Sequence, residues 1–510
     1  MERFHSAVHS PEDLQHVWRE KMWLMAFIGI AVAARIVFVL HNDVYFDDAF
    51  ITFRYARNLI QGHGLVYQPG EHVYGASSPL YAILCAGLWA LVGDALLPSA
   101  AWWTGTAGII IFVLAVLRLF PGGSPARIVT AIALLCYPRI FYSTVGGMEE
   151  CLVLAFMGLS VCAAMDRRWN LTGLLCGALL FLKVDTIAWC ILLFSLIGIW
   201  ERKVPWKVIL ISFLVVLPWG AFSELYYGSV IPHAIEAKRV AFAASSQFTL
   251  SDIIKLPAPD PLKSDFWAVL VFAACSYGVI VASVVRILRM RAWVLLVFPL
   301  YCVSYQLVLV LSGTPPGLWD RWTVPLWGAF IVCFGIWFDG LRSPWLRDQF
   351  AALRIRFRAA LLILGCALLL IPFAYPERRG LALGSFKEAG IWLRDNGSPG
   401  SDVILEPIGM IGYLSGIRIH DFIGLVSPEI TTARAREFSN AWYATYLAER
   451  LPTFVVLRDV EMNSNEFLIG GYGKGILTAA ERTWFLGTYH EVFRTAQGLA
   501  SNRLVIFSRL

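Results

Sequence analysis

Two adjacent carboxylates, Asp47 and Asp48, follow an apolar run that ends at residue 40, and Arg54 and Arg57 come after them at helical spacing. Carboxylates are costly to place at the edge of a membrane and usually have a task there. Because neighbouring carboxylates repel each other, one of them can keep a raised pKa, which suits a base that accepts a hydroxyl proton. The alternative is a helix N-terminus whose dipole the pair stabilises. We favour the catalytic interpretation because the pair directly follows the apolar run.

A second acidic pair, Glu149 and Glu150, stands at the start of another apolar run, directly after Gly146, Gly147 and Met148. Acidic residues also suit a helix N-terminus, so this motif taken alone favours a structural role and a functional role equally. The glycines permit close approach of the backbone to a ligand or to a neighbouring helix.

Several cations lie beside apolar segments and could hold a phosphate at a membrane surface. Lys183 is two residues from Asp185, and the two side chains could simply neutralise each other. Lys238 and Arg321 flank other apolar runs, where snorkelling to the membrane interface is the simpler account of each one taken singly. His233 follows a proline, and we expect it to be a hydrogen-bonding loop residue rather than a metal ligand.

The composition indicates a polytopic α-helical membrane protein. Of 510 residues, 58% are hydrophobic and only 15% are charged, whereas soluble domains carry roughly 25% charged residues. Apolar runs of nearly the length that a bilayer requires recur along the chain. We expect about eleven transmembrane helices, at roughly 22–40, 98–119, 125–141, 148–165, 171–184, 186–200, 206–222, 266–287, 292–312, 323–339 and 359–375.

Basic residues cluster in alternate loops between these runs, which predicts a cytoplasmic N-terminus by the positive-inside rule. The first run then is a retained anchor, and the acidic pairs, Lys183, Lys238 and Arg321 all lie on the extracytoplasmic side. The apolar stretch 79–92 is short for a span and would invert every later loop. We therefore expect it to be an interfacial or re-entrant helix within a first external loop at 41–97.

The composition changes after residue 375, where short β-type runs alternate with helical stretches. The runs at 403–405, 453–457 and 504–507 predict strands, and no later segment is long enough to span a bilayer. We expect two domains, a transmembrane catalytic module at 1–375 and an extracytoplasmic α/β domain at 376–510.

Other classes of function lack their sequence signals. No P-loop or GxGxxG motif is present, and the basic residues sit in short membrane loops rather than in a patch that would bind nucleic acid. The ten cysteines all lie in apolar segments, with neither a CxxC nor a Cys/His cluster, so a disulfide framework or a zinc site is not indicated. No metal site is predicted, although a divalent cation stays open, because two carboxylates could bind one while the spacing supplies no third acidic ligand.

Long motifs in this chain resemble those of the GT-C membrane glycosyltransferases, and most closely the branch that contains the terminal arabinofuranosyltransferase of mycobacterial cell walls. They are DDAFITFRYARN at 47–58, GHGLVYQPGE at 62–71 and GASSPL at 75–80, with later blocks YYGSVIPH at 226–233 and IGYLSG at 411–416. GME at residues 147 to 149, AK at 237 to 238 and DFIGL at 421 to 425 extend the resemblance nearly end to end. Glu150, His233 and the Lys183–Asp185 segment depart from the residues that this branch usually has.

The resemblance implies a GT-C fold and a sugar donor linked to polyprenyl phosphate. It implies Asp47, with Asp48 as the alternate, as the base or charge stabiliser for the acceptor hydroxyl, and Glu149 as a residue that orients a substrate. Lys238, Arg321 and Lys183, in that order, are the expected phosphate ligands. The further expected substrate-binding residues are Arg54, Tyr55, Asp185 and His233.

The implied reaction is transfer of a sugar, with arabinofuranose favoured, from the lipid carrier to a cell-envelope glycan or other acceptor hydroxyl. It takes place at the extracytoplasmic face of a bacterial inner membrane and contributes to cell-envelope biogenesis. The alternative is a flippase or transporter of lipid-linked glycans. That class should place ionisable groups at mid-membrane depth or show paired broken helices, whereas the charged motifs of this chain fall on one side.

Overall fold

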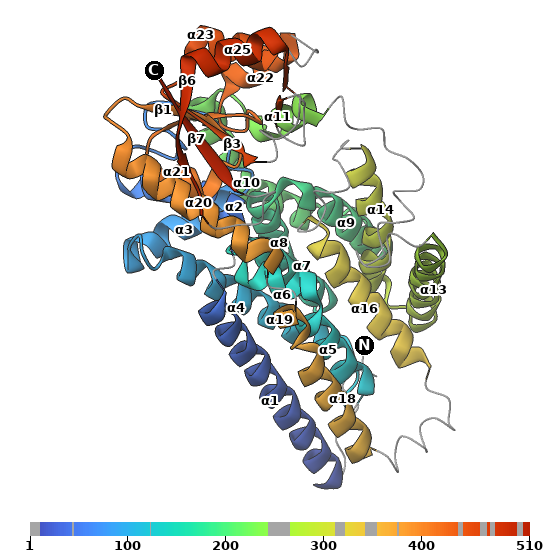
Figure 1. The fold of residues 1–510 in the computed structure, drawn as a ribbon. Helices are drawn as coiled ribbons and strands as arrows, with labels where there is room; N and C mark the ends of the chain where they lie inside the picture. The colour runs from blue at the N-terminus through green and yellow to red at the C-terminus, as the bar shows by residue number, and fades with distance from the viewer. Residues whose placement is uncertain are drawn as a thin grey trace.

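A computed structural model describes residues 11–42, 45–122, 124–242, 266–311, 322–341, 354–374, 377–436, 442–459, 467–469, 475–496 and 503–510. In this part of the chain a long bundle of helices carries a smaller mixed α and β unit at one end (Figure 1). The predicted domain boundary at 375/376 falls outside the described residues, and so does Arg321.

The bundle consists mainly of apolar helices. They are α1 (Pro11–His41), α2 (Asp47–Ile60), α3 (Pro79–Val92), α4 (Leu97–Leu117), α5 (Pro125–Cys136), α6 (Pro138–Val145), α7 (Glu150–Met165), α8 (Trp169–Leu182), α9 (Ile187–Glu201), α10 (Trp206–Tyr227), α11 (His233–Phe242), α13 (Phe266–Met290), α14 (Val297–Leu311), α16 (Val324–Gly340), α18 (Arg354–Leu368) and α19 (Ile371–Ala374), with short 3-10 turns at Val184–Thr186 and Trp293–Leu296.

Each predicted span contains a described helix, and the protein is a helical membrane protein with several apolar spans. Five of the described helices are long and apolar enough to cross a membrane, or six if the bent pair of α5 and α6 counts as one span. Several others have only 14 to 17 residues, so the number eleven stays a prediction. Helix α3 has 14 residues, about 21 Å at 1.5 Å per residue, which is shorter than a bilayer core of about 30 Å.

The break between α5 and α6 is built around a proline and a buried arginine. The two helices meet at an angle of 57°, and Pro138 cannot continue the hydrogen-bond ladder because it lacks an amide proton. Arg35 of α1, buried at 1% exposure, donates to the Leu135 carbonyl at 2.9 Å and to Thr144 Oγ1 at 2.8 Å. Arg35 thereby satisfies a carbonyl at the break and ties it to the end of α6.

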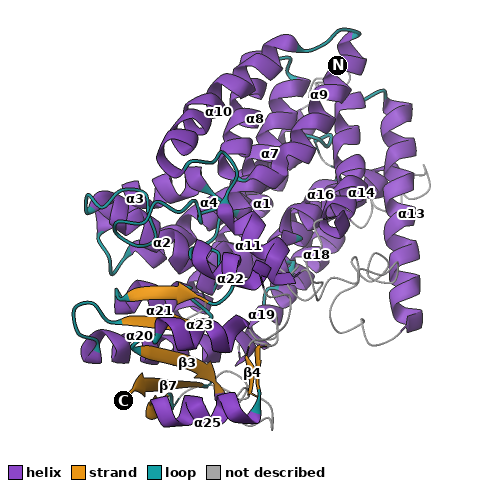
Figure 2. Ribbon diagram, turned by 90° about the horizontal axis from the view of Figure 1, so that it is seen from above, coloured by secondary structure: helices purple, strands orange, loops and turns teal. Residues whose placement is uncertain are grey.

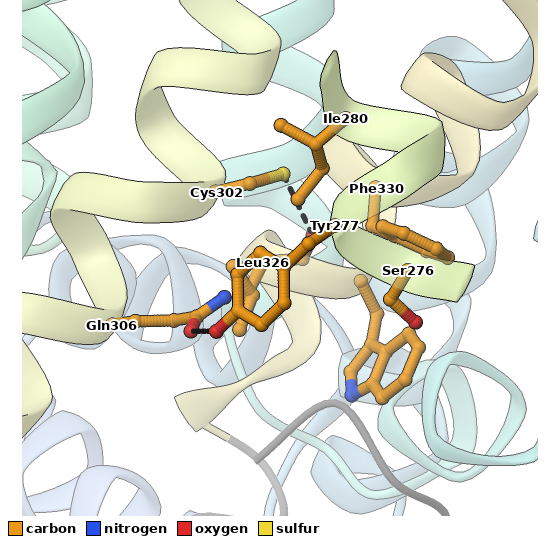
Figure 3. A pocket seen from close by; sticks show the side chains of 8 residues that line it. Ser276, Tyr277, Ile280, Cys302, Gln306, Leu326 and Phe330 are labelled. Carbon is orange, nitrogen blue, oxygen red and sulfur yellow. Dashed lines mark hydrogen bonds between the residues drawn. The ribbon is translucent and has the colours of Figure 1, made fainter. Parts of the chain in front are cut away.

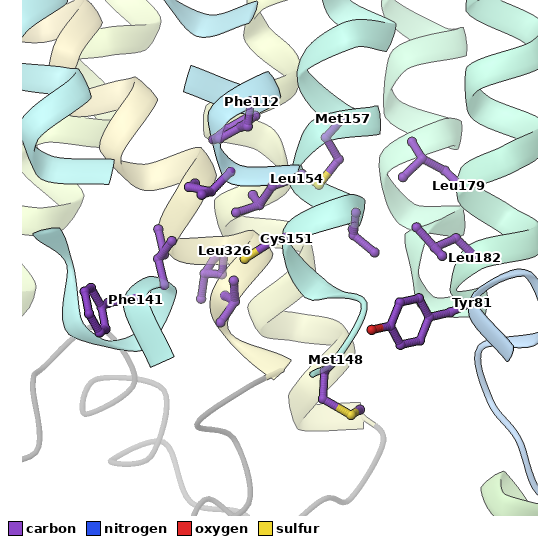
Figure 4. Close-up of a cluster of buried hydrophobic side chains, with 14 of the residues drawn as sticks. Tyr81, Phe112, Phe141, Met148, Cys151, Leu154, Met157, Leu179, Leu182 and Leu326 are labelled. Carbon is purple, nitrogen blue, oxygen red and sulfur yellow. The ribbon is translucent and has the colours of Figure 1, made fainter. Parts of the chain in front are cut away.

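Helices α4, α6 and α7 approach each other closely because α4 presents glycines to them. A Cβ added at Gly105 would lie 2.6 Å from the Thr144 carbonyl oxygen, and one at Gly108 would lie 2.6 Å from that of Cys151. Small residues at such crossings let helix backbones meet within a membrane. Leu154 and Met157 of α7 lie in the buried cluster beside this contact (Figure 4). The loop that carries Glu149 between α6 and α7 is therefore held by a tightly packed core.

The C-terminal unit has a five-stranded mixed sheet in the order β2-β1-β3-β7-β6. Strands β1 (Asp402–Leu405), β2 (Arg418–Asp421) and β3 (Phe454–Arg458) pair in parallel, whereas β6 (Tyr489–Arg494) and β7 (Leu504–Arg509) pair antiparallel, and a separate hairpin joins β4 (Phe467–Ile469) to β5 (Gly475–Leu477). The helices of this unit are α20 (Glu377–Asn396), α21 (Gly409–Ser415), α22 (Pro428–Arg436), α23 (Trp442–Arg450) and α25 (Ala479–Thr488).

The strands predicted from the sequence, now β1, β3 and β7, are confirmed as the inner strands of this sheet. The sequence missed β2 and β6, which form its two edges and carry charged side chains such as Asp421 and Glu491. Charged residues on edge strands discourage unwanted pairing but also hide the strand from hydrophobic patterns. The sheet stands beside the helical bundle, close to α2 and its loop (Figure 2).

Candidate functional site

An open pocket of about 530 Å³ lies where the two parts of the chain meet. Its lining comes from α2, the loop before α3, the loop before α7, the end of α8, α11 and a turn of the C-terminal unit. The lining residues are Asp48, Ile51, Thr52, Gly75, Ala76, Ser77, Ser78, Met148, Glu149, Glu150, Lys183, Ala234, Lys238, Trp322 and Leu425. Four of the residues predicted to act in catalysis or substrate binding thus share one pocket: Asp48, Glu149, Lys183 and Lys238.

Asp48 reaches the pocket from the first turn of α2. The segment before this helix is fixed to the second acidic motif, because the Phe46 amide donates to the Gly146 carbonyl at 3.0 Å. A Cβ added at Gly146 would lie 2.3 Å from the Phe46 ring, so only glycine permits this approach. The two acidic motifs, about a hundred residues apart in sequence, are held together by their backbones.

Glu149, Glu150 and Lys183 form a buried charged group on one wall of the pocket. Lys183 Nζ lies 3.1 Å from Glu149 Oε1 and 3.6 Å from Glu150 Oε1, and the two carboxylate side chains are 2% and 0% exposed. Buried carboxylates require such a partner, because isolated charges are costly to remove from water. Lys183 lies at the end of α8, so this group joins α7 to α8.

Lys238 lines the pocket from helix α11. It shares a face of this helix with Ala234, which is four residues earlier in the chain. Its ammonium group lies 4.7 Å from the centre of the Trp322 ring. Lys238 and Trp322 both line the pocket, and a lysine ammonium over an aromatic face stays charged and can donate to an anion. Arg321 precedes Trp322 in sequence but lies outside the described residues, so its predicted role is untested.

Asp47, the residue first expected to be the base, lies in a different environment. Its carboxylate accepts hydrogen bonds from the backbone amides of Gly409 and Met410, both at 2.8 Å, at the N-terminus of α21. Burial raises the pKa of Asp47 to about 7, although these two amides oppose the shift. Asp47 therefore contributes to the contact between the domains, and Asp48 is the member of this acidic pair that lines the pocket.

Arg54 and Tyr55 also hold the domains and the loop rather than line the pocket. Arg54 is 2% exposed and donates to the carbonyls of Gly412 at 2.7 Å and Ile417 at 2.9 Å. Tyr55 donates to the Val73 carbonyl at 2.8 Å, which fixes the loop before α3. These contacts are structural, and the predicted part of Arg54 and Tyr55 in substrate binding stays a prediction.

Asp185 and His233 make contacts outside the pocket lining. Asp185 accepts a hydrogen bond from the Tyr305 hydroxyl at 2.8 Å and so ties the turn before α9 to α14. His233 Nε2 lies 3.1 Å from Thr431 Oγ1 of the C-terminal unit. Burial lowers the pKa of His233, which favours the neutral imidazole at this contact.

Sequence reasoning missed several residues of the pocket. Trp322 and Leu425 come from segments far from the acidic pairs and carry no charged signal. Ser77 and Ser78 lie within the GASSPL motif, which could have marked them as pocket residues. No cluster of three or more His, Cys, Asp or Glu side chains suited to a metal ion occurs in the described part of the chain, and a divalent cation stays a prediction.

A second cavity, of about 290 Å³, lies between α13, α14 and α16 within the bundle (Figure 3). Its lining is apolar apart from Ser276, Tyr277, Cys302, Gln306 and Trp327, and Tyr277 donates to Gln306 Oε1 at 2.7 Å. This lining contains no charged side chain, so we assign no reaction to the cavity.

Comparisons with known proteins agree with this architecture. A family profile described as a domain of unknown function, DUF8728, matches residues 377–506. The terminal beta-(1->2)-arabinofuranosyltransferase of Mycobacterium tuberculosis is 28% identical over an alignment of 227 residues that covers 38% of this chain and 35% of the relative. The matched stretch thus spans about a third of that protein.

Solved structures match over nearly the whole chain. ArnT from Cupriavidus metallidurans has a TM-score of 0.59 at 12% identity in the apo state and 0.60 at 14% when bound to undecaprenyl phosphate, with 96% of this chain and 98% of that chain covered. An oligosaccharyltransferase from Archaeoglobus fulgidus matches with a TM-score of 0.55 at 14% identity. The match covers 94% of this chain and 73% of the oligosaccharyltransferase chain. The chain therefore has the fold of the GT-C membrane glycosyltransferases.

Proposed function

We propose that this protein is a GT-C glycosyltransferase that transfers a sugar from polyprenyl phosphate to a hydroxyl group of a cell-envelope glycan. The observation that carries the proposal is the shared pocket, which places one carboxylate, Asp48, together with the cation Lys238 and the buried Glu149–Lys183 pair. Such a transfer needs two groups: a carboxylate that can accept a proton as a base, and a cation that can hold a phosphate.

The reaction breaks the bond between the sugar C1 and the phosphate oxygen and forms a bond between C1 and the acceptor oxygen. Asp48 accepts the proton of the acceptor hydroxyl as the new bond forms. Lys238 stabilises the negative charge that develops on the departing lipid phosphate. Because the leaving group is a lipid phosphate, the reaction requires no nucleotide.

Glu149 and Lys183 act from the other wall. The two carboxylates beside Lys183 compensate its charge, which weakens it as a phosphate ligand, and the Glu149–Lys183 pair is better suited to orient sugar hydroxyls. This assignment keeps Glu149 as the orienting residue and places Lys238 first among the phosphate ligands.

The favoured sugar is arabinofuranose. It is supported by the motifs at residues 47–80 and by the 28% identity to a mycobacterial protein whose name states that activity. The favoured orientation places the N-terminus in the cytoplasm and the pocket and C-terminal unit outside a bacterial inner membrane, as the distribution of basic loops predicts. ArnT has been solved with undecaprenyl phosphate, which supports a lipid-linked donor here.

A flippase of lipid-linked glycans remains the alternative to test, but the pocket argues against it. Its charged side chains come from α2, the start of α7, the end of α8 and α11, and the C-terminal unit also lines it, so they gather where the two parts of the chain meet rather than along a path through the membrane-spanning helices. Translocation pathways place ionisable groups near mid-membrane depth.

The test is transfer of labelled sugar from synthetic polyprenyl-phosphate donors, arabinofuranose first and mannose second, by purified protein with total cell-envelope glycan as acceptor. The proposal predicts label on the acceptor. Movement of the labelled lipid between liposome leaflets without any transfer would instead establish a flippase.

A further inference from the structure

Leu425 is the residue that the C-terminal unit contributes to the pocket, among the described residues. It is partly buried and packs against both the hydrophobic core of the helical bundle and that of the C-terminal unit. Its apolar side chain has no part in proton transfer or phosphate binding. Its contribution is shape.

The turn that carries Leu425 is held from within by Asp421, which is 1% exposed. The Asp421 carboxylate accepts the amides of Ile423 at 2.9 Å and Val426 at 3.2 Å. Gly424 has a φ of +90°, and a Cβ there would lie 2.4 Å from Thr431 Oγ1. The turn is thus a fixed part of the wall rather than a loop with many conformations.

Two contacts fix this turn against the helical bundle. Thr431 donates to the Gly424 carbonyl at 3.2 Å and also meets His233 at the start of α11. On the other side, a Cβ added at Gly75 would lie 2.9 Å from the Leu425 carbonyl oxygen. Leu425 therefore stands between α11, which bears Lys238, and the loop before α3.

We infer that Leu425 determines the size of the sugar that the pocket accepts next to the lipid phosphate. The inference rests on the proposed function and deepens it. A phosphate held by Lys238 carries its sugar on the adjoining atom, and Leu425 is beside the helix that holds that phosphate. The leucine side chain then packs on the carbon face of a small sugar, a pentofuranose, and disfavours the larger ring of a hexopyranose at the same position.

The experiment compares wild-type protein with Leu425→Ala and Leu425→Trp. Leu486, half exposed on α25 of the same unit, provides the matched control as Leu486→Ala. The probes are polyprenyl-phosphoryl arabinofuranose, polyprenyl-phosphoryl mannose and polyprenyl phosphate without sugar. Binding to the detergent-purified protein and kcat/KM for transfer are both measured.

We expect Leu425→Ala to raise the mannose-to-arabinofuranose ratio about tenfold in both measurements, which is the scale on which apolar pockets discriminate by size. Leu425→Trp should weaken the binding of both sugar lipids, and it should weaken the binding of the mannose lipid more than that of the arabinofuranose lipid. Polyprenyl phosphate without sugar should bind equally to wild type and to every variant, and Leu486→Ala should behave as wild type.

An unchanged ratio in both folded Leu425 variants would overturn the inference, as would an equal loss of affinity for the sugar-free lipid. Wild-type protein that binds both sugar lipids but transfers neither would contradict the proposed function, whereas its binding ratio would still decide the role of Leu425. Binding of neither sugar lipid would contradict both.

Discussion

At the residue scale, the acidic pair Asp47–Asp48 divides into two tasks because successive residues of a helix point about 100° apart. Asp47 turns to α21, where two backbone amides occupy its carboxylate, whereas Asp48 lines the pocket. The sequence resemblance favoured Asp47, with Asp48 as the alternate, whereas Asp48 is the member of the pair that lines the pocket. That choice depends on α21, more than 350 residues away, whose approach is not encoded near the pair.

Lys238 can be tested separately from the acidic pair. Lys238→Ala should weaken binding of polyprenyl phosphate by about tenfold or more, since a charge-assisted hydrogen bond contributes roughly 1.5–3 kcal/mol. Arg239→Ala is the matched control, because Arg239 is the next residue of α11 and its side chain is exposed. Binding is measured directly in detergent. Equal affinity in Lys238→Ala and wild type would move the phosphate site to another cation.

At the scale of elements, the break between α5 and α6 positions the loop that carries Glu149. Arg35→Met should lower the free energy of unfolding by about 1–3 kcal/mol, because the Leu135 carbonyl at the break loses its buried donor. Arg118→Ala, which removes an exposed ion pair with Asp166, should cost less than about 1 kcal/mol. Thermal unfolding in detergent compares the two. Equal shifts would show that Arg35 does not support the break.

Another element-scale contact joins β1, β2 and α22 through His420. His420 Nε2 lies 2.9 Å from Asp402, and Nδ1 lies 3.6 Å from Glu429. Burial disfavours the charged imidazole, but the hydrogen bond with Asp402 and the negative charges of both carboxylates outweigh it and raise the pKa of His420 above its usual 6.5. Burial alone would likewise raise the pKa of Asp402, yet the bonds from His420 and Thr453 lower it to about 2.

These pKa shifts predict how stability changes with pH. The contribution of His420 is complete below about pH 6.5 and is lost as the pH rises through the higher folded-state pKa, so the unfolding midpoint should fall on the alkaline side. The contribution of Asp402 is present above about pH 4 and is lost as the pH falls toward 2. His420→Gln should abolish the alkaline fall, whereas His490→Gln, at an exposed position of β6, should keep it. Identical profiles in the two variants would contradict this account.

At the scale of the whole molecule, the C-terminal unit completes the pocket and is clamped to α2 and its loop. The Gln68 side chain of that loop donates a hydrogen bond to the Ile419 carbonyl and accepts one from the Ile419 amide. It therefore covers the edge of the sheet at β2. Asp47→Asn should loosen the clamp by about 1–2 kcal/mol, since an amide cannot accept two backbone hydrogen bonds as well as a carboxylate does. Faster proteolysis between residues 376 and 402 would report this loosening, and an unchanged cleavage rate would contradict it.

The sequence predicted the membrane class, the positions of the helices and the inner strands, because each has a local signal in hydrophobic length or period. It also named four pocket residues, Asp48, Glu149, Lys183 and Lys238. It could not assign Arg54 to domain contact or place Leu425 in the pocket, because both depend on packing between segments more than 300 residues apart. Charge made Arg54 conspicuous, whereas Leu425 was marked only as part of the DFIGL motif at 421 to 425, which assigned it no role.

The most direct test of the central claim is a single-turnover transfer assay with Asp48→Asn and Asp47→Asn side by side, using saturating polyprenyl-phosphoryl arabinofuranose. Asp48 lines the pocket and accepts the hydroxyl proton in this account, so Asp48→Asn should slow the chemical step by at least about 100-fold without loss of donor binding. Asp47→Asn should keep most of the rate under conditions in which the domains stay together. Near-normal transfer by Asp48→Asn, or the reverse order of the two variants, would contradict the assignment of the base.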